Sequence, residues 1–372
     1  MTAFTELVRT FVAREITPHH AQWEADGIVP RELWRKAGAT GLLGLGLPAE
    51  YGGGGASYRF NAAVDAELYR CGATGPGFTV HNDVCGPYFA DLATPEQLRR
   101  WVPGMTSGEL IAAIAMTEPG AGSDLRGIRT SASRIDGGWL LTGAKTFISN
   151  GIHADLVIVV ARTDVEGKAG LSLLVAERGS VGFTRGRNLD KVGLHAQDTS
   201  ELTFDNVEVP DANILGEPGK GLHYLMANLA QERLTIAVQA VAAMEGVLEE
   251  TLDYVKSRTA FGAPIGHFQH NAFLLAELAT SVKAARVFVD WGVDQHVAGL
   301  LGADTAAMMK LHASEAQQHI VDRCLQLHGG YGYTTEYRVG RAWADARVQT
   351  IYGGTSEMMK LIISRSLGLH GA

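Results

Sequence analysis

A chain of 372 residues exceeds the size at which one hydrophobic core usually stops growing, so the sequence predicts two or three packed units with a cleft between them. Apolar residues make up 46% and charged residues 19%, a balance that excludes a disordered chain. The formal net charge is −8 and no dense cluster of lysine and arginine occurs, which argues against a nucleic-acid partner.

The cysteines and the hydropathy pattern bear on location. Cys71, Cys85 and Cys324 lie far apart and outside any CxxC pair, which argues against a disulfide framework and a structural zinc site. Neither a signal-peptide core nor an apolar segment of ~20 residues is present, so we expect no membrane insertion. A cytoplasmic protein fits this pattern best.

The predicted elements fall into three blocks. Residues 1–112 carry apolar side chains at helical spacing, and residues 113–217 contain short β-rich runs such as 156–161 and 171–175. Residues 218–372 return to helical spacing, with long segments near 221–256, 268–299, 304–327 and 355–368 that could pack as a bundle. Helices and strands in separate blocks predict an α+β fold with three domains, 1–112, 113–217 and 218–372.

Several common catalytic and binding motifs are missing. The sequence has no GxGxxG after a strand, no P-loop with Ser or Thr after its lysine, and no GxSxG nucleophile elbow. It has no HExxH, and His267 and His270 lack a third ligand, so we predict no metal.

Two glycine-rich stretches, residues 115–124 and 143–151, offer a candidate ligand loop. Glycine lets the backbone approach a ligand closely, and the hydroxyls of Thr117, Ser123 and Ser149 can bind phosphate or ring heteroatoms. The loop could cradle a phosphorylated cofactor. A turn-rich connection between strands remains the alternative interpretation.

Glu232 interrupts an apolar stripe on one predicted helix. The stripe consists of Leu225, Leu229, Ile236, Ala240 and Met244, which are spaced by three or four residues with Glu232 among them. Burial of an unpaired carboxylate costs several kcal/mol, so Glu232 should be either ion-paired or functional. Periodicity alone leaves both alternatives open.

Two further clusters lie near predicted helix ends. Residues 326–333 end one helix with glycines suited to left-handed caps, and residues 351–357 open the last helix with Thr355 as a candidate N-cap. The free N–H groups at this helix start could face an anion or serve capping alone.

Together these segments resemble the acyl-CoA dehydrogenase family, over nearly the whole chain. The resemblance rests on residues 115–124, 147–150, 258–262, 326–330 and 351–355, in the order and spacing of the family. The likeness is greatest to the long-chain branch, as in Phe147-Ile-Ser-Asn150 and Ala196-Gln-Asp-Thr-Ser200.

The resemblance implies an N-terminal helical domain, a middle β-barrel and a C-terminal four-helix bundle. It also implies a homotetramer, a dimer of dimers, with FAD bound across a subunit interface. The residues implied to line the flavin are Ile114, Met116, Thr117, Gly122, Ser123, Phe147, Ile148 and Ser149. Those implied to hold the FAD of a neighbouring subunit are Arg258, Phe261, Gln269, Gln326, Leu327, Gly329 and Gly330, and Thr355, Ser356 and Glu357 complete the site.

The catalytic base departs from the commonest family pattern. Many members carry it as Glu in Ile-Tyr-Glu-Gly-Thr, where this chain has Gly353. The long-chain and isovaleryl-type branches place it on a bundle helix in a Glu-Arg-Leu context, which Glu232 fills. The resemblance therefore implies α,β-dehydrogenation of an acyl-CoA to the trans-2-enoyl-CoA, with Glu232 as base and flavin N5 as hydride acceptor.

Substrate contacts and electron acceptor are implied in the same way. The expected substrate-binding residues are Ser123, His223, Tyr224, Gln231, Arg233, Tyr352, Gly353 and Gly354. The N–H of Glu232 is the expected protein donor to the thioester oxygen. An electron-transfer flavoprotein is the expected partner, in fatty acid metabolism.

Two alternatives accompany this interpretation. A flavin-dependent oxidase or monooxygenase could use the same fold, and a non-catalytic scaffold could keep the fold without the cofactor. Acyl chain length and branching depend on pocket depth, which the sequence does not predict. The sequence also leaves open whether coenzyme A or a carrier protein holds the acyl group, and whether the role is catabolic or biosynthetic.

Overall fold

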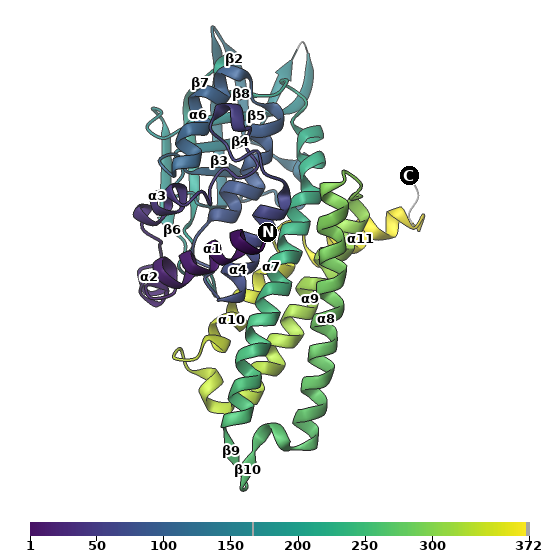
Figure 1. The fold of residues 1–372 in the computed structure, drawn as a ribbon. Coiled ribbons are helices and arrows are strands. Elements are labelled where there is room, and N and C mark those ends of the chain that lie inside the picture. Colours follow the sequence, from purple (N-terminus) through teal and green to yellow (C-terminus); the bar gives the residue numbers. More distant parts are fainter. Residues whose placement is uncertain (166, 370–372) are drawn as a thin grey trace.

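The computed structural model describes residues 1–165 and 167–369, and it divides into three parts in chain order (Figure 1). A helical part comes first, a β-sheet follows, and long helices complete the chain. Runs of helices and strands in separate blocks make this the α+β fold that the sequence predicts.

Short helices build the first part. They are α1 (Thr2–Phe11), the π-helical η1 (Val12–Ile16), α2 (His20–Asp26), α3 (Arg31–Ala39), α4 (Tyr58–Arg70), the π-helical η3 (Val80–Cys85), α5 (Gly86–Leu92) and α6 (Pro95–Ser107). Helix α6 begins with a capping box, in which Thr94 Oγ1 accepts from the N–H of Gln97 and Gln97 Oε1 accepts from the N–H of Thr94. Trp34 and Phe78 meet edge to face in the core of this part, with ring centroids 4.9 Å apart.

A single eight-stranded sheet forms the middle part. Its strands are β1 (Ala112–Ala115), β2 (Ser131–Ile135), β3 (Gly138–Ser149), β4 (Leu156–Val165), β5 (Lys168–Glu177), β6 (Phe183–Asn188), β7 (Thr199–Pro210) and β8 (Ile214–Leu215). They follow the order β6-β7-β3-β2-β4-β5-β8, with β1 pairing in parallel with β4. The predicted β domain is present, although no pairing between the end strands β6 and β8 closes it into a barrel within the described residues.

Strand β4 is buried on both faces, which explains its uninterrupted apolar sequence. Leu156, Ile158 and Val160 pack in one core with Phe89 of α5 and Trp101 of α6. The alternate residues Val157, Val159 and Ala161 pack in a second core with Phe204 and Trp139 of the sheet. Successive side chains of a strand point to opposite faces, so one strand serves two cores.

Long helices form the third part, lying side by side in Figure 1. They are α7 (Gly221–Ser257), α8 (Gln269–Val297) and α9 (Ala303–His328), joined by a small hairpin of β9 (Thr259–Ala260) and β10 (Ala263–Pro264) between α7 and α8. The shorter helices α10 (Arg338–Ala346) and α11 (Ser356–Ser366) both pack against α9. Helix α10 is an addition to the four segments that periodicity predicts, because its nine residues are too few to give a clear period.

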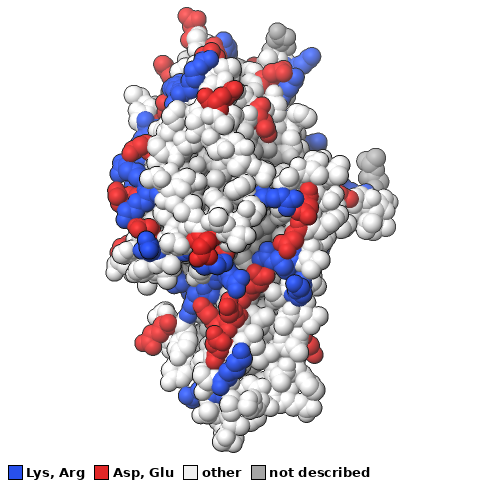
Figure 2. All heavy atoms as spheres, viewed as in Figure 1, with Lys and Arg blue, Asp and Glu red and all other residues white. Residues whose placement is uncertain are grey.

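Charges on the surface are mixed rather than of one sign. Figure 2 shows acidic and basic side chains side by side in a band where the first part meets the bundle. Ion pairs from Arg70 to Glu249, Arg286 to Glu245 and Arg338 to Glu250 join α4, α7, α8 and α10. Over the described ranges, no helix is long and apolar enough to cross a membrane.

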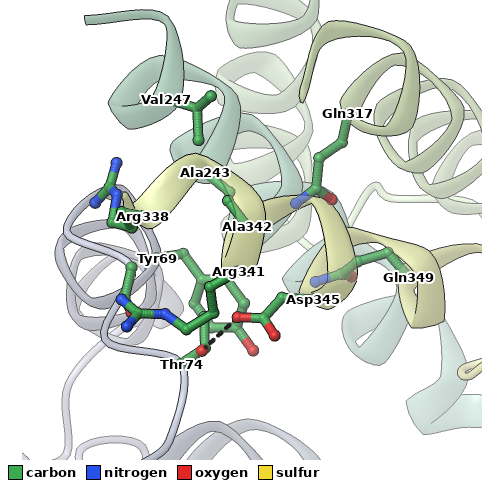
Figure 3. A pocket seen from close by; sticks show the side chains of 11 residues that line it. Tyr69, Thr74, Ala243, Val247, Gln317, Arg338, Arg341, Ala342, Asp345 and Gln349 are labelled. Carbon is green, nitrogen blue, oxygen red and sulfur yellow. Dashed lines mark hydrogen bonds between the residues drawn. The ribbon is translucent and has the colours of Figure 1, made fainter. Parts of the chain in front are cut away.

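Asp345 of α10 connects all three parts of the chain. Its Oδ2 accepts from Thr74 Oγ1 at 2.9 Å and its Oδ1 accepts from the N–H of Leu194, in the loop between β6 and β7, at 2.6 Å. Figure 3 shows Asp345 facing Thr74 beside a small cavity also lined by Arg341 and Tyr69. Burial raises the pKa of Asp345 to about 6, and the bond from Leu194 only partly opposes this.

The raised pKa of Asp345 gives a pH-dependent contribution to stability. Its pKa is higher in the folded than in the unfolded state, so its contribution is greatest at low pH and is lost as the pH rises through about 6. Asp345→Asn keeps an oxygen for Leu194 and removes the titration. The variant should therefore gain stability relative to wild type by ~1.4 kcal/mol between about pH 5 and pH 8. Thermal unfolding of both proteins across this range checks it, and a difference that is constant or falls with pH would contradict it.

Candidate functional site

Glu232 lies on α7 where the turn of residues 351–355 crosses the helix. On the predicted stripe, Leu225, Ile236, Ala240 and Met244 are buried, while Leu229 and Glu232 itself are half-buried. A Cβ placed on Gly353 would come within 3.6 Å of Glu232 Oε1 and 2.3 Å of Ile236 Cδ1. Gly353 therefore allows the turn to approach the helix closely, and the carboxylate faces this turn.

No side chain neutralises Glu232 directly. Within the described residues Glu232 forms no ion pair and no side-chain hydrogen bond. Burial raises the pKa of its carboxyl, and the positive charges of Arg233 and Lys310 partly oppose that rise. The ion-paired structural glutamate that periodicity left open is therefore not what the structure contains.

Two N–H groups of the turn are free to bind a ligand. The N–H groups of Ile351 and Tyr352 donate to Val348 O at 2.8 and 3.1 Å. Those of Gly353 and Gly354 donate to no acceptor in the described part of the chain, and both residues have positive φ, 60° and 95°. These N–H groups are candidate donors to an oxyanion.

The expectation that the N–H of Glu232 serves as such a donor is wrong. Glu232 lies in the middle of the continuous helix α7, where each N–H donates to the carbonyl four residues earlier. Its N–H is thus already engaged, unlike those of the turn. The sequence indicates that residues 351–355 form a turn. Only the backbone conformation shows which N–H groups of this turn are already hydrogen-bonded and which are not.

The π-helical segment η3 and helix α5 form the opposite wall. Gln231 Nε2 donates to Asp83 O of η3 at 2.8 Å, and Gln231 Oε1 lies 2.9 Å from His296 Nε2 of α8. Gln231 was expected to bind substrate, yet its amide joins three helices and fixes α7 next to Glu232. Tyr88 of α5 is 1% exposed, and its hydroxyl has no hydrogen-bond partner in residues 1–165 and 167–369. Its pKa is raised by burial and by the charge of Glu232.

The other expected substrate residues lie in different surroundings. Arg233 is buried and its Nε lacks a partner among the described residues. At the start of α7, His223 is exposed, and the hydroxyl of Tyr224 accepts from the N–H of Glu217 at 3.0 Å. Tyr352 and Gly354 belong to the turn that faces Glu232, whereas Ser123 lies exposed in the glycine-rich loop.

The predicted flavin loop is held against β3. The N–H of Thr146 donates to Thr117 O at 3.0 Å, and Lys145 Nζ donates to Met116 O at 3.0 Å and to Glu118 Oε1 at 2.9 Å. Burial would raise the pKa of Glu118, but hydrogen bonds from residues 129, 130 and 145 outweigh it and hold the pKa at about 2. Residues 114–123 and 147–149 are therefore brought together, as the resemblance implies.

A planar aromatic cofactor fits this place. Phe147, at the end of β3, is 68% exposed with φ 58°, a conformation that a bulky residue rarely adopts. Asn150, with φ 62°, is fully buried and donates to Gly77 O and Ala112 O, which fixes the backbone behind it. A Cβ on Gly120 or Gly122 would meet nothing within 4 Å, so the loop borders open space. These residues fit FAD, with Phe147 offering a ring face.

The residues expected to hold a neighbour's FAD gather at the far end of the bundle. Arg258, Gln326, Leu327, Gly329 and Gly330 line a cleft of about 570 Å³ between the end of α7 and the residues after α9, whereas Phe261 and Gln269 lie outside its lining. Arg258 lies 5.7 Å from the ring centroid of Tyr331. Phe261 is 98% exposed in the hairpin between β9 and β10. Along α7, the helical rise places Arg258 about 39 Å from Glu232. One chain therefore carries two separate sets of predicted cofactor residues.

Thr355, Ser356 and Glu357 begin α11 beside the turn. Thr355 Oγ1 accepts from the N–H of Met358 at 3.3 Å, so Thr355 is the N-cap, as predicted. Ser356 is buried and Glu357 is exposed. Capping uses one N–H of this helix start, which leaves others for a ligand.

Comparisons with known proteins identify the family. The chain matches family models described as acyl-CoA dehydrogenase N-terminal domain over residues 1–109, middle domain over 113–207 and C-terminal domain over 219–368. It is 49% identical to the mitochondrial long-chain specific acyl-CoA dehydrogenase of Sus scrofa over 98% of this chain and 85% of that protein.

Solved structures agree. The structure of an acyl-CoA dehydrogenase from Geobacillus kaustophilus, 46% identical, superposes with a TM-score of 0.96 over 98% of this chain and 97% of that chain. A glutaryl-CoA dehydrogenase from Mycobacterium smegmatis in complex with FADH2, 29% identical, superposes with a TM-score of 0.94 over 100% and 95%. The chain therefore belongs to the acyl-CoA dehydrogenase family and is an FAD-dependent oxidoreductase that dehydrogenates acyl-CoA thioesters.

Proposed function

We propose that Glu232 is the base that removes the α-proton of the acyl thioester. The observation that carries this assignment is an unpaired carboxylate in largely apolar surroundings, facing a turn with two unused N–H groups. Burial raises the pKa of Glu232, which brings it closer to the range in which a general base works well at neutral pH.

The chain's own residues would act on the thioester as follows. The Glu232 carboxylate accepts the α-proton, and the electron pair of that C–H bond moves toward the thioester carbonyl and then forms the double bond between the α- and β-carbons as hydride leaves the β-carbon. The N–H groups of Gly353 and Gly354 stabilise the negative charge that develops on its oxygen. Bound FAD, held by residues 114–123 and 147–149, supplies the acceptor for the hydride that leaves the β-carbon.

Replacing Glu232 with Gln tests the base. Gln keeps the shape but cannot accept the proton, so flavin reduction by acyl-CoA should fall by ~10²–10⁴-fold or more while FAD stays bound. Stopped-flow bleaching of the flavin absorbance measures this. Glu208→Gln, at an exposed position on β7, is the matched control and should behave as wild type. Bleaching at the wild-type rate in the Glu232 variant would exclude Glu232 as the base.

The substrate is proposed to be a long-chain acyl-CoA, with an electron-transfer flavoprotein as acceptor. The support is the 49% identity to a relative named for long chains, and Gly353, which adds no side chain beside Glu232. A role in fatty acid metabolism follows.

A panel of acyl-CoA thioesters tests substrate and acceptor together. Flavin reduction should be fastest with long unbranched chains, and turnover should require the electron-transfer flavoprotein rather than oxygen. Oxygen consumption without that partner would instead favour an oxidase. Preference for short or branched acyl groups would exclude the long-chain assignment.

We also propose a homotetramer in which each FAD is bound by two chains. Arg258 and the base are about 39 Å apart, too far for one pocket of ordinary size. Helix α8 also exposes Phe273, Val287 and Trp291, with 61%, 58% and 46% of their surfaces accessible, and such apolar exposure marks subunit contacts.

Arg258→Ala tests the shared site. It should lower the FAD content of the purified protein, because the guanidinium would bind the cofactor of a neighbouring chain, whereas Lys256→Ala, two residues earlier and exposed, should not. Flavin absorbance and light scattering measure FAD content and mass. A monomer with full FAD content and activity would contradict the proposal.

We also propose that the protein is located in the cytoplasm. The cysteines Cys71, Cys85 and Cys324 are all free, as expected in a reducing compartment.

A further inference from the structure

Lys310 of α9 is a buried cation close to the proposed base. Its side chain is 0% exposed, and Ala306, Met309 and Ala313, neighbours on the same helix, are also fully buried. Burial of a lysine ammonium costs several kcal/mol unless hydrogen bonds and opposite charges compensate. The buried ammonium of Lys310 therefore requires a hydrogen-bond acceptor or an opposite charge.

Lys310 binds the turn that faces Glu232. Its Nζ donates to Gly354 O at 2.7 Å, while the adjacent Gly353 lies against Glu232 and Ile236. Both glycines have positive φ, so no regular secondary structure fixes this turn. The hydrogen bond from Lys310 thus holds the segment that carries the two unused N–H groups.

A neutral hydrogen-bond donor could bind the Gly354 carbonyl equally well. The hydrogen bond alone therefore does not explain why this residue is charged. The acidic groups near it are Glu232 from α7, Glu357 from α11 and Glu315 from α9, while the charge of Arg233 repels it. Glu315 and Glu357 are exposed and screened by water, whereas Glu232 shares the poorly solvated interior. The Lys310 charge therefore acts most strongly on Glu232.

Three other polar groups around Glu232 carry no positive charge. Cys85, Tyr88 and Tyr352 face it from η3, α5 and the turn, and burial raises the pKa of each, so all three stay neutral at physiological pH. Arg233, which directly follows Glu232 on α7, is the other cation near the carboxylate, and it opposes the rise of the Glu232 pKa more strongly than Lys310 does. Burial lowers the pKa of Lys310 to about 8, which still leaves it mainly protonated at pH 7.

We propose that Lys310 is a positioning residue for the dehydrogenation. Its ammonium fixes the Gly353–Gly354 turn against α7 and, together with Arg233, supplies the positive charge that favours the ionised form of the Glu232 carboxylate. This inference rests on Glu232 being the base.

Lys310→Met tests the inference in the FAD-loaded protein. Met has similar length but no charge, so the pH midpoint of Glu232 should move upward by about one unit. Two measurements report this shift of the midpoint. Infrared titration of the resting protein, with Glu232→Gln as the spectral reference, gives the midpoint without substrate. The pH profile of flavin reduction by an acyl-CoA should move in the same direction, to higher pH.

Charge-keeping and surface variants provide the controls. Lys310→Arg should restore a midpoint close to that of wild type, and Lys36→Met, which removes an exposed lysine of α3, should leave it unchanged. If Lys310→Met loses FAD, Lys310→Arg is compared with Lys310→Gln, which keeps a donor but no charge. Equal midpoints in wild type and the Met variant, or in the Arg and Gln variants, would overturn the inference.

The outcome separates this inference from the assignment of the base. Flavin bleaching that persists in Glu232→Gln would remove Glu232 as base, yet the infrared shift in Lys310→Met would remain. An absent infrared shift would overturn the role of Lys310 even if Glu232 proved essential.

Discussion

The site depends on a carboxylate held among apolar side chains without a direct ion-pair partner. Glu232 lies between α7, the turn at Gly353 and the wall formed by η3 and α5, and burial raises its pKa. Two cations, Arg233 and Lys310, moderate that rise without forming a salt bridge to it. The carboxylate is thus basic enough to accept a proton and near enough to positive charge to stay ionised.

Helices and strands, and not loops alone, position the base and the predicted cofactor residues. Helix α7 runs without interruption from Gly221 to Ser257, so one helix carries the base in its interior and the start of the second cofactor cleft at its C-terminal end. Strand β3 ends at Ser149 with Phe147 exposed beside the glycine-rich loop. The hydrogen bonds of Gln231 connect α7 to η3 and α8 near the base, which limits movement of the carboxylate.

Much of this site could be predicted from the sequence, because its signals are periodic or local. Glu232 was found as a polar residue in an apolar stripe, and Thr355 as a cap by its place before a helix. Lys310 carries the same signal as Glu232, since Ala306, Ala307 and Ala313 flank it at helical spacing, although no motif of the family resemblance includes it. The contacts of Gln231 and Asp345 join segments more than 60 residues apart, and no local pattern encodes such pairings.

The most direct measurement is a crystal structure of the FAD-loaded protein with a non-reducible thioester analogue. A Glu232 carboxylate oxygen should lie within ~3.5 Å of the carbon that corresponds to the α-carbon, a distance suited to proton transfer. The thioester oxygen should accept from the N–H of Gly353 or Gly354. A carboxylate turned toward solvent, or an analogue bound with its α-carbon away from α7, would contradict the central claim.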